Sequence, residues 1–154
     1  MWGIPRWPLA LGLAGLLPFL AAAVISQLPA PLMMGDSYPI VSNEDGRDLL
    51  ASYGVVILSF MSGVLWGFAA RGSHPIWYGL SVLPALYCFF YVNAGVFTGG
   101  LLTDALINLM IGFAALLALD GIYSWKKLAP VWWMKLRLLL TAVVLPCLAI
   151  GAFL

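Results

Sequence analysis

The chain has 154 residues, of which 64% are hydrophobic and 8% charged, and its net charge is +1. A globular domain in water is about 25% charged, and a chain of this length cannot bury so much apolar surface, so the composition excludes a soluble domain and predicts a lipid environment. The low net charge excludes a nucleic-acid-binding protein.

Apolar segments predict an all-α bundle of five transmembrane helices, which form a single domain over residues 1–154. Each segment holds roughly 20 residues, the length that crosses about 30 Å of hydrocarbon at 1.5 Å per residue. The predicted spans are 8–28, 49–70, 76–95, 101–120 and 136–154. We interpret the first as a retained span because its apolar run exceeds the roughly 7–15 residues of a secretory signal.

The basic residues predict the orientation of the bundle, because lysine and arginine are enriched in cytoplasmic loops. Six of the seven fall on one side, namely Arg6, Arg71, Lys126, Lys127, Lys135 and Arg137. The N-terminus is therefore expected inside and the C-terminus outside. All seven tryptophans fall toward the same basic side, where an indole ring suits the headgroup boundary.

The segment 29–48 combines proline, glycine and serine with four acidic residues. Such a composition predicts an exposed loop, which the orientation places outside. We expect Ser42 or Asn43 to cap the helix that follows, with acidic side chains near its positive end.

A stripe of small residues runs along the second span, at Ser59, Gly63 and Gly67. Four-residue spacing places them on one helix face. Because lipid is as apolar as leucine, helices associate in a bilayer through close packing at such small faces. We interpret this packing stripe as a contact with another helix of the same bundle. A ligand groove or a partner's helix on the same face is the alternative.

Polar side chains gather near the outer end of several spans. Asp104 and Asn108 share one face of the fourth span, and Gln27 and Asn93 end the first and third spans. Because a charge inside hydrocarbon is costly, we expect this outer polar cluster to face the bundle interior. We interpret this cluster as a set of hydrogen bonds that holds the helix ends together. The alternative is a pocket that binds a lipid or quinone head group or a proton.

The segment 121–137 alternates basic and aromatic residues and is expected to lie in the inner headgroup plane. The residues expected to contact anionic phospholipid are Lys126, Lys127, Lys135 and Arg137. We expect Asp120 to form a structural ion pair with a nearby base such as Arg71 or Lys126, and a proton relay is the alternative. His74, the sole histidine, is expected to be a solvated turn residue.

The sequence contains no recognisable catalytic or metal-binding pattern, such as a Ser/His/Asp set, HExxH, a phosphate loop or CxxCH. Catalysis needs convergent titratable groups, so we predict that the protein is not an enzyme and holds no metal or cofactor. Cys88 and Cys147 lie in apolar runs and are interpreted as buried hydrophobes.

Three stretches, "LGLAGLLPFL" (11–20), "YGVVILSFMSGVLWGF" (53–68) and "PVWWMKLRLLLTAVV" (130–144), carry a family likeness. The chain resembles a family of small membrane proteins of unknown function that includes the mitochondrial transmembrane protein 69. The resemblance implies an energy-transducing membrane and supplies no activity.

These observations favour a non-catalytic accessory or assembly subunit of an electron-transfer complex, respiratory or photosynthetic, in a bacterial inner membrane. Its expected partners are other membrane subunits and membrane lipid, either anionic phospholipid or quinone. The alternatives are a small transporter or proton-linked carrier that uses Asp104 and Asn108, and a lipid-modifying enzyme.

Overall fold

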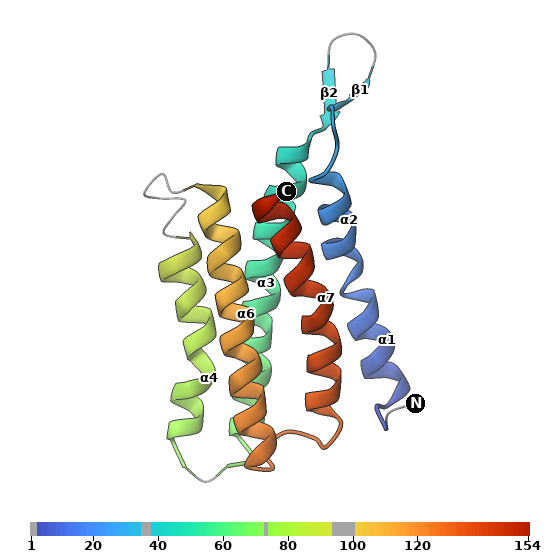
Figure 1. The fold of residues 1–154 in the computed structure, drawn as a ribbon. Helices are drawn as coiled ribbons and strands as arrows, with labels where there is room; N and C mark the ends of the chain where they lie inside the picture. Colours follow the sequence, from blue (N-terminus) through green and yellow to red (C-terminus); the bar gives the residue numbers. More distant parts are fainter. Residues whose placement is uncertain (1–2, 35–37, 73, 94–100) are drawn as a thin grey trace.

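The computed structural model describes residues 3–34, 38–72, 74–93 and 101–154. The helices lie side by side, with the two termini at opposite ends of the bundle (Figure 1). In chain order the elements are α1 (Arg6–Ala14), α2 (Leu17–Ile25), β1 (Leu32–Met34), β2 (Tyr38–Val41), α3 (Asn43–Ala69), α4 (Ile76–Tyr87), the π-helix η1 (Cys88–Asn93), α6 (Leu102–Trp125) and α7 (Trp133–Phe153).

Four described stretches are long and apolar enough to cross a membrane. They are Arg6–Ile25, which comprises α1 and α2, Asn43–Ala69, Leu102–Trp125 and Trp133–Phe153. A shorter apolar helix covers Ile76–Val92 at the position of the third predicted span. The prediction of an all-α, multi-pass membrane protein is confirmed.

The first span is broken near its middle. Pro18 has no N–H to donate to the carbonyl of Ala14, and its ring crowds that carbonyl. Accordingly α1 ends at Ala14, and α2 begins at Leu17 with the proline in its first turn. A second proline, Pro84, lies inside α4, and the chain continues as a π-helix from Cys88. Both prolines interrupt the regular hydrogen-bond ladder.

The predicted outer loop differs from the structure in two ways. It contains a short antiparallel ribbon, in which Leu32 pairs with Val41. The helix that follows begins at Asn43, not near 49, because Ser42 caps it. The Asp45 carboxylate accepts from the Ser42 N–H at 2.7 Å, and the Ser42 hydroxyl accepts from the Asp45 N–H at 3.4 Å. This reciprocal capping box confirms the predicted cap.

Replacing Ser42 by alanine is expected to lower the free energy of unfolding by about 1 kcal/mol, the usual effect of losing an N-cap side chain. Thermal unfolding in detergent micelles measures the loss. Ser52→Ala, at an exposed position of the same helix, is the control and is expected to change stability by less than about 0.5 kcal/mol. Equal effects of the two substitutions would contradict the capping role.

The core lies where α3 and α6 meet. Leu58 of α3 and Leu109 of α6 are both 0% exposed. Glycines allow this close approach: a Cβ at Gly54 would lie 2.8 Å from Leu109 Cδ1, and a Cβ at Gly112 would lie 2.7 Å from Leu58 Cδ2. Helix association in this bundle therefore uses small-residue contacts, as expected in lipid, but at glycines other than those of the packing stripe.

Candidate functional site

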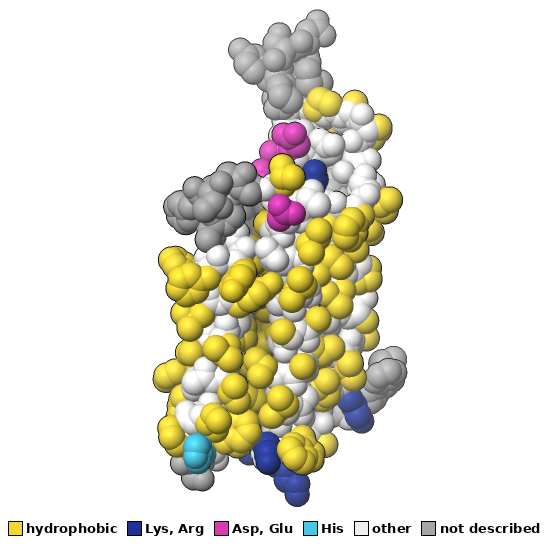
Figure 2. Space-filling view, turned by 60° about the vertical axis from the view of Figure 1, so that its left-hand side comes forward, with side chains coloured by type: hydrophobic (Ala, Val, Ile, Leu, Met, Phe, Trp, Pro, Cys, Tyr) yellow, Lys and Arg dark blue, Asp and Glu magenta, His cyan; other side chains and the backbone are white. Residues whose placement is uncertain are grey.

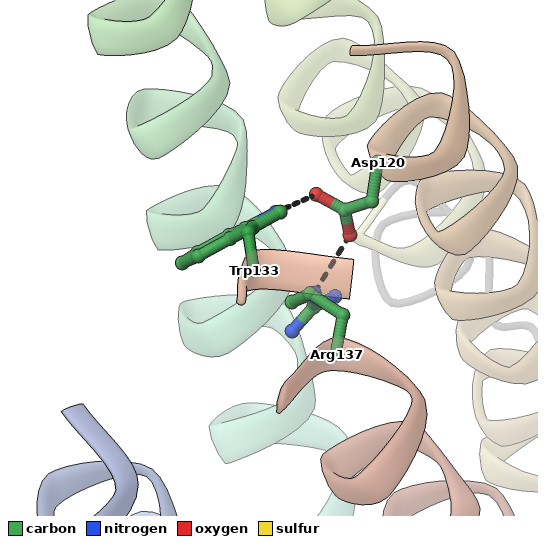
Figure 3. A network of polar contacts seen from close by, with 3 residues as sticks. All are labelled: Asp120, Trp133 and Arg137. Carbon is green, nitrogen blue, oxygen red and sulfur yellow. Dashed lines mark hydrogen bonds and ion pairs between the residues drawn. The ribbon is translucent and has the colours of Figure 1, made fainter. Parts of the chain in front are cut away.

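A buried polar network joins α6 to α7 near the basic end of the bundle. Asp120 is 1% exposed and Arg137 is 3% exposed. One Asp120 oxygen accepts from Arg137 Nε at 2.7 Å, and the other accepts from the Trp133 indole N–H at 2.8 Å (Figure 3). The carboxylate is thus held by a cation on one side and an indole on the other.

The predicted ion pair of Asp120 is confirmed, but its predicted partners are wrong. Arg71 instead donates from Nη1 to the carbonyl of Leu128 at 3.3 Å, and Lys126 lies over the Trp125 ring at 4.3 Å from its centroid. The partner is Arg137, because α7 packs along α6 after a short connection and brings its second turn opposite Asp120.

This pairing also corrects the sequence-based role of Arg137. Its side chain is buried, so it does not belong with the headgroup contacts. Lys126, Lys127 and Lys135 are exposed at the ends of α6 and α7. Lysine, arginine and histidine side chains gather mainly at this lower end of the bundle, and acidic side chains at the upper end (Figure 2). His74 is exposed here and accepts the Ile76 N–H through Nδ1 at 3.2 Å, as expected for a turn residue.

A crevice of about 310 Å³ lies beside the network, between α1, α2, α3 and α7. Leu11 and Phe60 line it and are 70% and 61% exposed, whereas Phe19 and Phe113 line it and are 1% exposed. The crevice therefore has an exposed rim and a buried, apolar floor. Its volume lies in the range of small-molecule sites, which is about 300–1,000 Å³.

Two polar side chains line this otherwise apolar crevice. Arg137 Nη2 and Thr141 Oγ1 are buried there and have no hydrogen-bond partner among the described residues. The two residues are one helical turn apart on α7 and so share a face. An unsatisfied buried donor destabilises a protein by about 1–3 kcal/mol, and by more when it is charged. A bound hydrogen-bond acceptor at these two atoms would remove that cost.

The outer polar cluster is not assembled among the described residues. The Gln27 amide donates to Ser26 Oγ at 3.3 Å, and the Asn108 amide donates to the carbonyl of Tyr91 at 3.1 Å. Asp104 is exposed in the first turn of α6. The side chain of Asn93 lies outside the described residues. The Gln27 and Asn108 amides thus bind separate partners, and neither of these hydrogen bonds involves Asp104.

The packing stripe is largely uncovered. Ser59 lies close to Cys88 of η1, but Gly63 and Gly67 are exposed, and a Cβ at either would meet no atom of the described residues within 4 Å. The interpretation that another helix of this chain covers them is wrong. The physical reason is that α3 turns a neighbouring face inward, where Ser62 donates to the carbonyl of Ser81 on α4.

Comparisons with known proteins agree with this architecture. The family described as "Protein of unknown function (DUF3429)" matches residues 4–153. The chain belongs to this family. Transmembrane protein 69 of Xenopus tropicalis is 33% identical over 144 residues, which is 90% of this chain and 51% of that protein. The chain thus spans about half the length of this curated relative, and no solved structure matches it.

In this DUF3429 member, sequence reasoning missed the roles of Trp133, Arg137 and Thr141. One signal was present: Arg137 lies inside the predicted span 136–154, where a charge normally turns inward and finds a partner. Thr141 gave no such signal, because a lone threonine in an apolar helix is unremarkable until the crevice beside it is known.

Proposed function

We propose that the protein is a non-catalytic accessory or assembly subunit of an electron-transfer complex, respiratory or photosynthetic, in a bacterial inner membrane. It crosses the membrane five times, with its N-terminus inside, packs against other subunits through helix contacts and organises lipid or quinone at the complex edge. The unequal distribution of charged side chains between the two ends of the bundle supports this orientation (Figure 2).

The observation that carries the proposal is the exposed part of the packing stripe. A glycine in a helix costs about 1 kcal/mol relative to alanine. Contacts among the described residues offset that cost at Gly54 and Gly112, but no contact from that part of the chain does so at Gly63 or Gly67. A helix from a partner subunit would supply the missing contact, because small faces allow close backbone approach in lipid.

Basic residues at the inner end support the lipid-organising part of the role. Lys126, Lys127 and Lys135 are exposed there, and each adds about 1 kcal/mol of attraction to an anionic lipid surface. These lysines and the packing stripe both favour a protein that associates with its partners through its membrane-facing surface.

The proposal predicts that Gly63→Leu with Gly67→Leu removes the protein from a larger assembly. The new side chains have space in the isolated chain, so its helix content is expected to be retained and its thermal stability is expected not to fall. Native electrophoresis after mild solubilisation of the source membranes measures the assembly. The wild-type chain is expected to migrate in a high-mass band, and the double variant mainly as the 16.6 kDa chain.

Gly79→Leu is the matched control, because Gly79 of α4 is also exposed and, within the part of the chain that the structure describes, nothing lies within 4 Å of its Cβ position. It is expected to leave the high-mass band intact. A wild-type chain that migrates only at its own mass would overturn the accessory role. If the double stripe variant assembles normally, the packing stripe plays no part in the accessory role.

The transporter alternative depended on Asp104 and Asn108 facing a shared polar pocket. Asp104 is exposed in the first turn of α6, whereas the Asn108 amide donates to the carbonyl of Tyr91, so we do not advance this alternative. A flux measured in proteoliposomes with the wild-type chain and abolished by Asp104→Asn would favour the transporter over an accessory role.

A further inference from the structure

The strongest unassigned feature of the molecule is the crevice between α1, α2, α3 and α7. It begins near Pro8 and Trp133 at the basic end and extends to Phe19 and Val144 nearer the middle of the bundle. Because its rim belongs to membrane-spanning helices, it opens to the hydrocarbon. A ligand would therefore enter from the bilayer and not from water.

The floor of the crevice offers two hydrogen-bonding groups to such a ligand. Arg137 and Thr141 are each 3% exposed, and their Nη2 and Oγ1 atoms have no partner in the described part of the chain. Arg137 contacts Asp120 through Nε, and a terminal nitrogen of its guanidinium points away from that carboxylate (Figure 3). Arg137 lines the crevice, and its Nη2 is the donor that the ion pair leaves without a partner among the described residues.

The charge balance of the site selects the kind of acceptor. Asp120 already neutralises Arg137, so a second carboxylate in the crevice would add an uncompensated negative charge in a medium of low dielectric constant. A neutral carbonyl oxygen satisfies the N–H and hydroxyl donors without that cost. A single water would have only these two polar partners, the low end of the usual range of about 2–4, and it would leave the apolar volume of the crevice unfilled.

We propose that this crevice binds a membrane-soluble molecule whose neutral carbonyl oxygen accepts from Arg137 Nη2 and Thr141 Oγ1, while its apolar body fills the space toward Phe19. Two membrane components carry this chemistry: a quinone ring and the ester carbonyl of an acylglycerol lipid. This inference deepens the proposed role in organising lipid or quinone and rests on it, but it does not depend on the packing stripe.

Binding is tested with the delipidated full chain in detergent, with bound ligand counted by native mass spectrometry. One pair of probes is a decyl-substituted benzoquinone and decylbenzene, which lacks the carbonyls. The other pair is a diester phosphatidylcholine and its diether analogue, which lacks the ester carbonyls. We expect saturable retention of one carbonyl-bearing ligand per chain and none of its carbonyl-free counterpart.

Two variants connect the binding to the crevice. Thr141→Val keeps the side-chain volume and removes the hydroxyl, so the affinity is expected to fall about threefold to tenfold, as for one lost hydrogen bond. Val64→Phe adds bulk to the crevice wall and is expected to abolish retention. Ser124→Ala is the matched control, because it removes another buried hydroxyl with no partner among the described residues, outside the crevice.

Retention that depends on the quinone carbonyls assigns the ligand to the quinones, and retention of the diester over the diether assigns it to acyl lipids. The proposal is overturned if the chain retains the carbonyl-bearing and the carbonyl-free member of each probe pair equally. It is also overturned if Thr141→Val and Val64→Phe bind the ligand as the wild type does. The stripe variant Gly63→Leu with Gly67→Leu is expected to bind normally. Ligand binding with no high-mass assembly would therefore reject the accessory role and leave the crevice assignment standing.

Discussion

Asp120→Asn is expected to lower the free energy of unfolding by about 3–5 kcal/mol, the usual effect of removing one partner from a buried ion pair. The substitution preserves the side-chain shape but leaves the Arg137 guanidinium, 3% exposed, without its counter-charge inside a membrane-spanning bundle. The loss is measured by unfolding the purified chain with a denaturing detergent in mixed micelles and following its helix content.

Two further variants separate the charge effect from a packing effect. Asp120→Leu combined with Arg137→Met removes both charges, and it is expected to be more stable than Asp120→Asn, because replacing a whole buried pair by apolar groups is often close to neutral. Asp48→Asn, at an exposed position on α3, is expected to change stability by less than about 0.5 kcal/mol. A double variant as unstable as the single one would show that the ion pair is not the cause.

Gly46→Leu is expected to lower the free energy of unfolding by about 3 kcal/mol, the upper end of the usual range for overpacking. A Cβ at Gly46 would collide with backbone atoms of α2, among them the Ser26 nitrogen and the Ala22 oxygen. Backbone cannot yield as a flexible side chain does, so α2 and α3 must separate. The same micelle unfolding assay measures the change.

Gly67→Leu provides the comparison on the same helix. No atom of residues 3–34, 38–72, 74–93 or 101–154 lies within 4 Å of a Cβ at this position, so the isolated chain is expected to gain up to about 1 kcal/mol from the higher helix propensity of leucine. If Gly46→Leu and Gly67→Leu lower the free energy of unfolding equally, the conclusion that Gly46 is tightly packed and Gly67 is not would be wrong.

Much of the fold could be predicted from local properties of the chain. Apolar segments of sufficient length predicted the helices, because only lipid can accommodate so much apolar surface. Ser42 was correctly predicted as a cap, since its residue type and the acidic residues after it point to the start of a helix. The ends of helices were predicted less well: α3 begins at Asn43 and α6 continues to Trp125, because charged residues can extend a helix beyond the hydrocarbon.

The candidate site depended on contacts that local patterns do not encode. Helical periodicity showed that Ser59, Gly63 and Gly67 share a face, but not that α3 turns its Ser62 side toward α4. The sequence also predicted an ion pair for Asp120, but the identity of its partner, Arg137, depended on how α7 packs against α6.

Hydropathy, charge distribution and capping are properties of single segments, so the membrane class, the helical fold and the capping of α3 followed from the order of residues. The rotation of each helix about its axis is different, because it is set by the joint packing of several helices in three dimensions. That rotation exposes Gly63, buries Arg137 against Asp120 and places Thr141 at the crevice floor. No single segment contains this information.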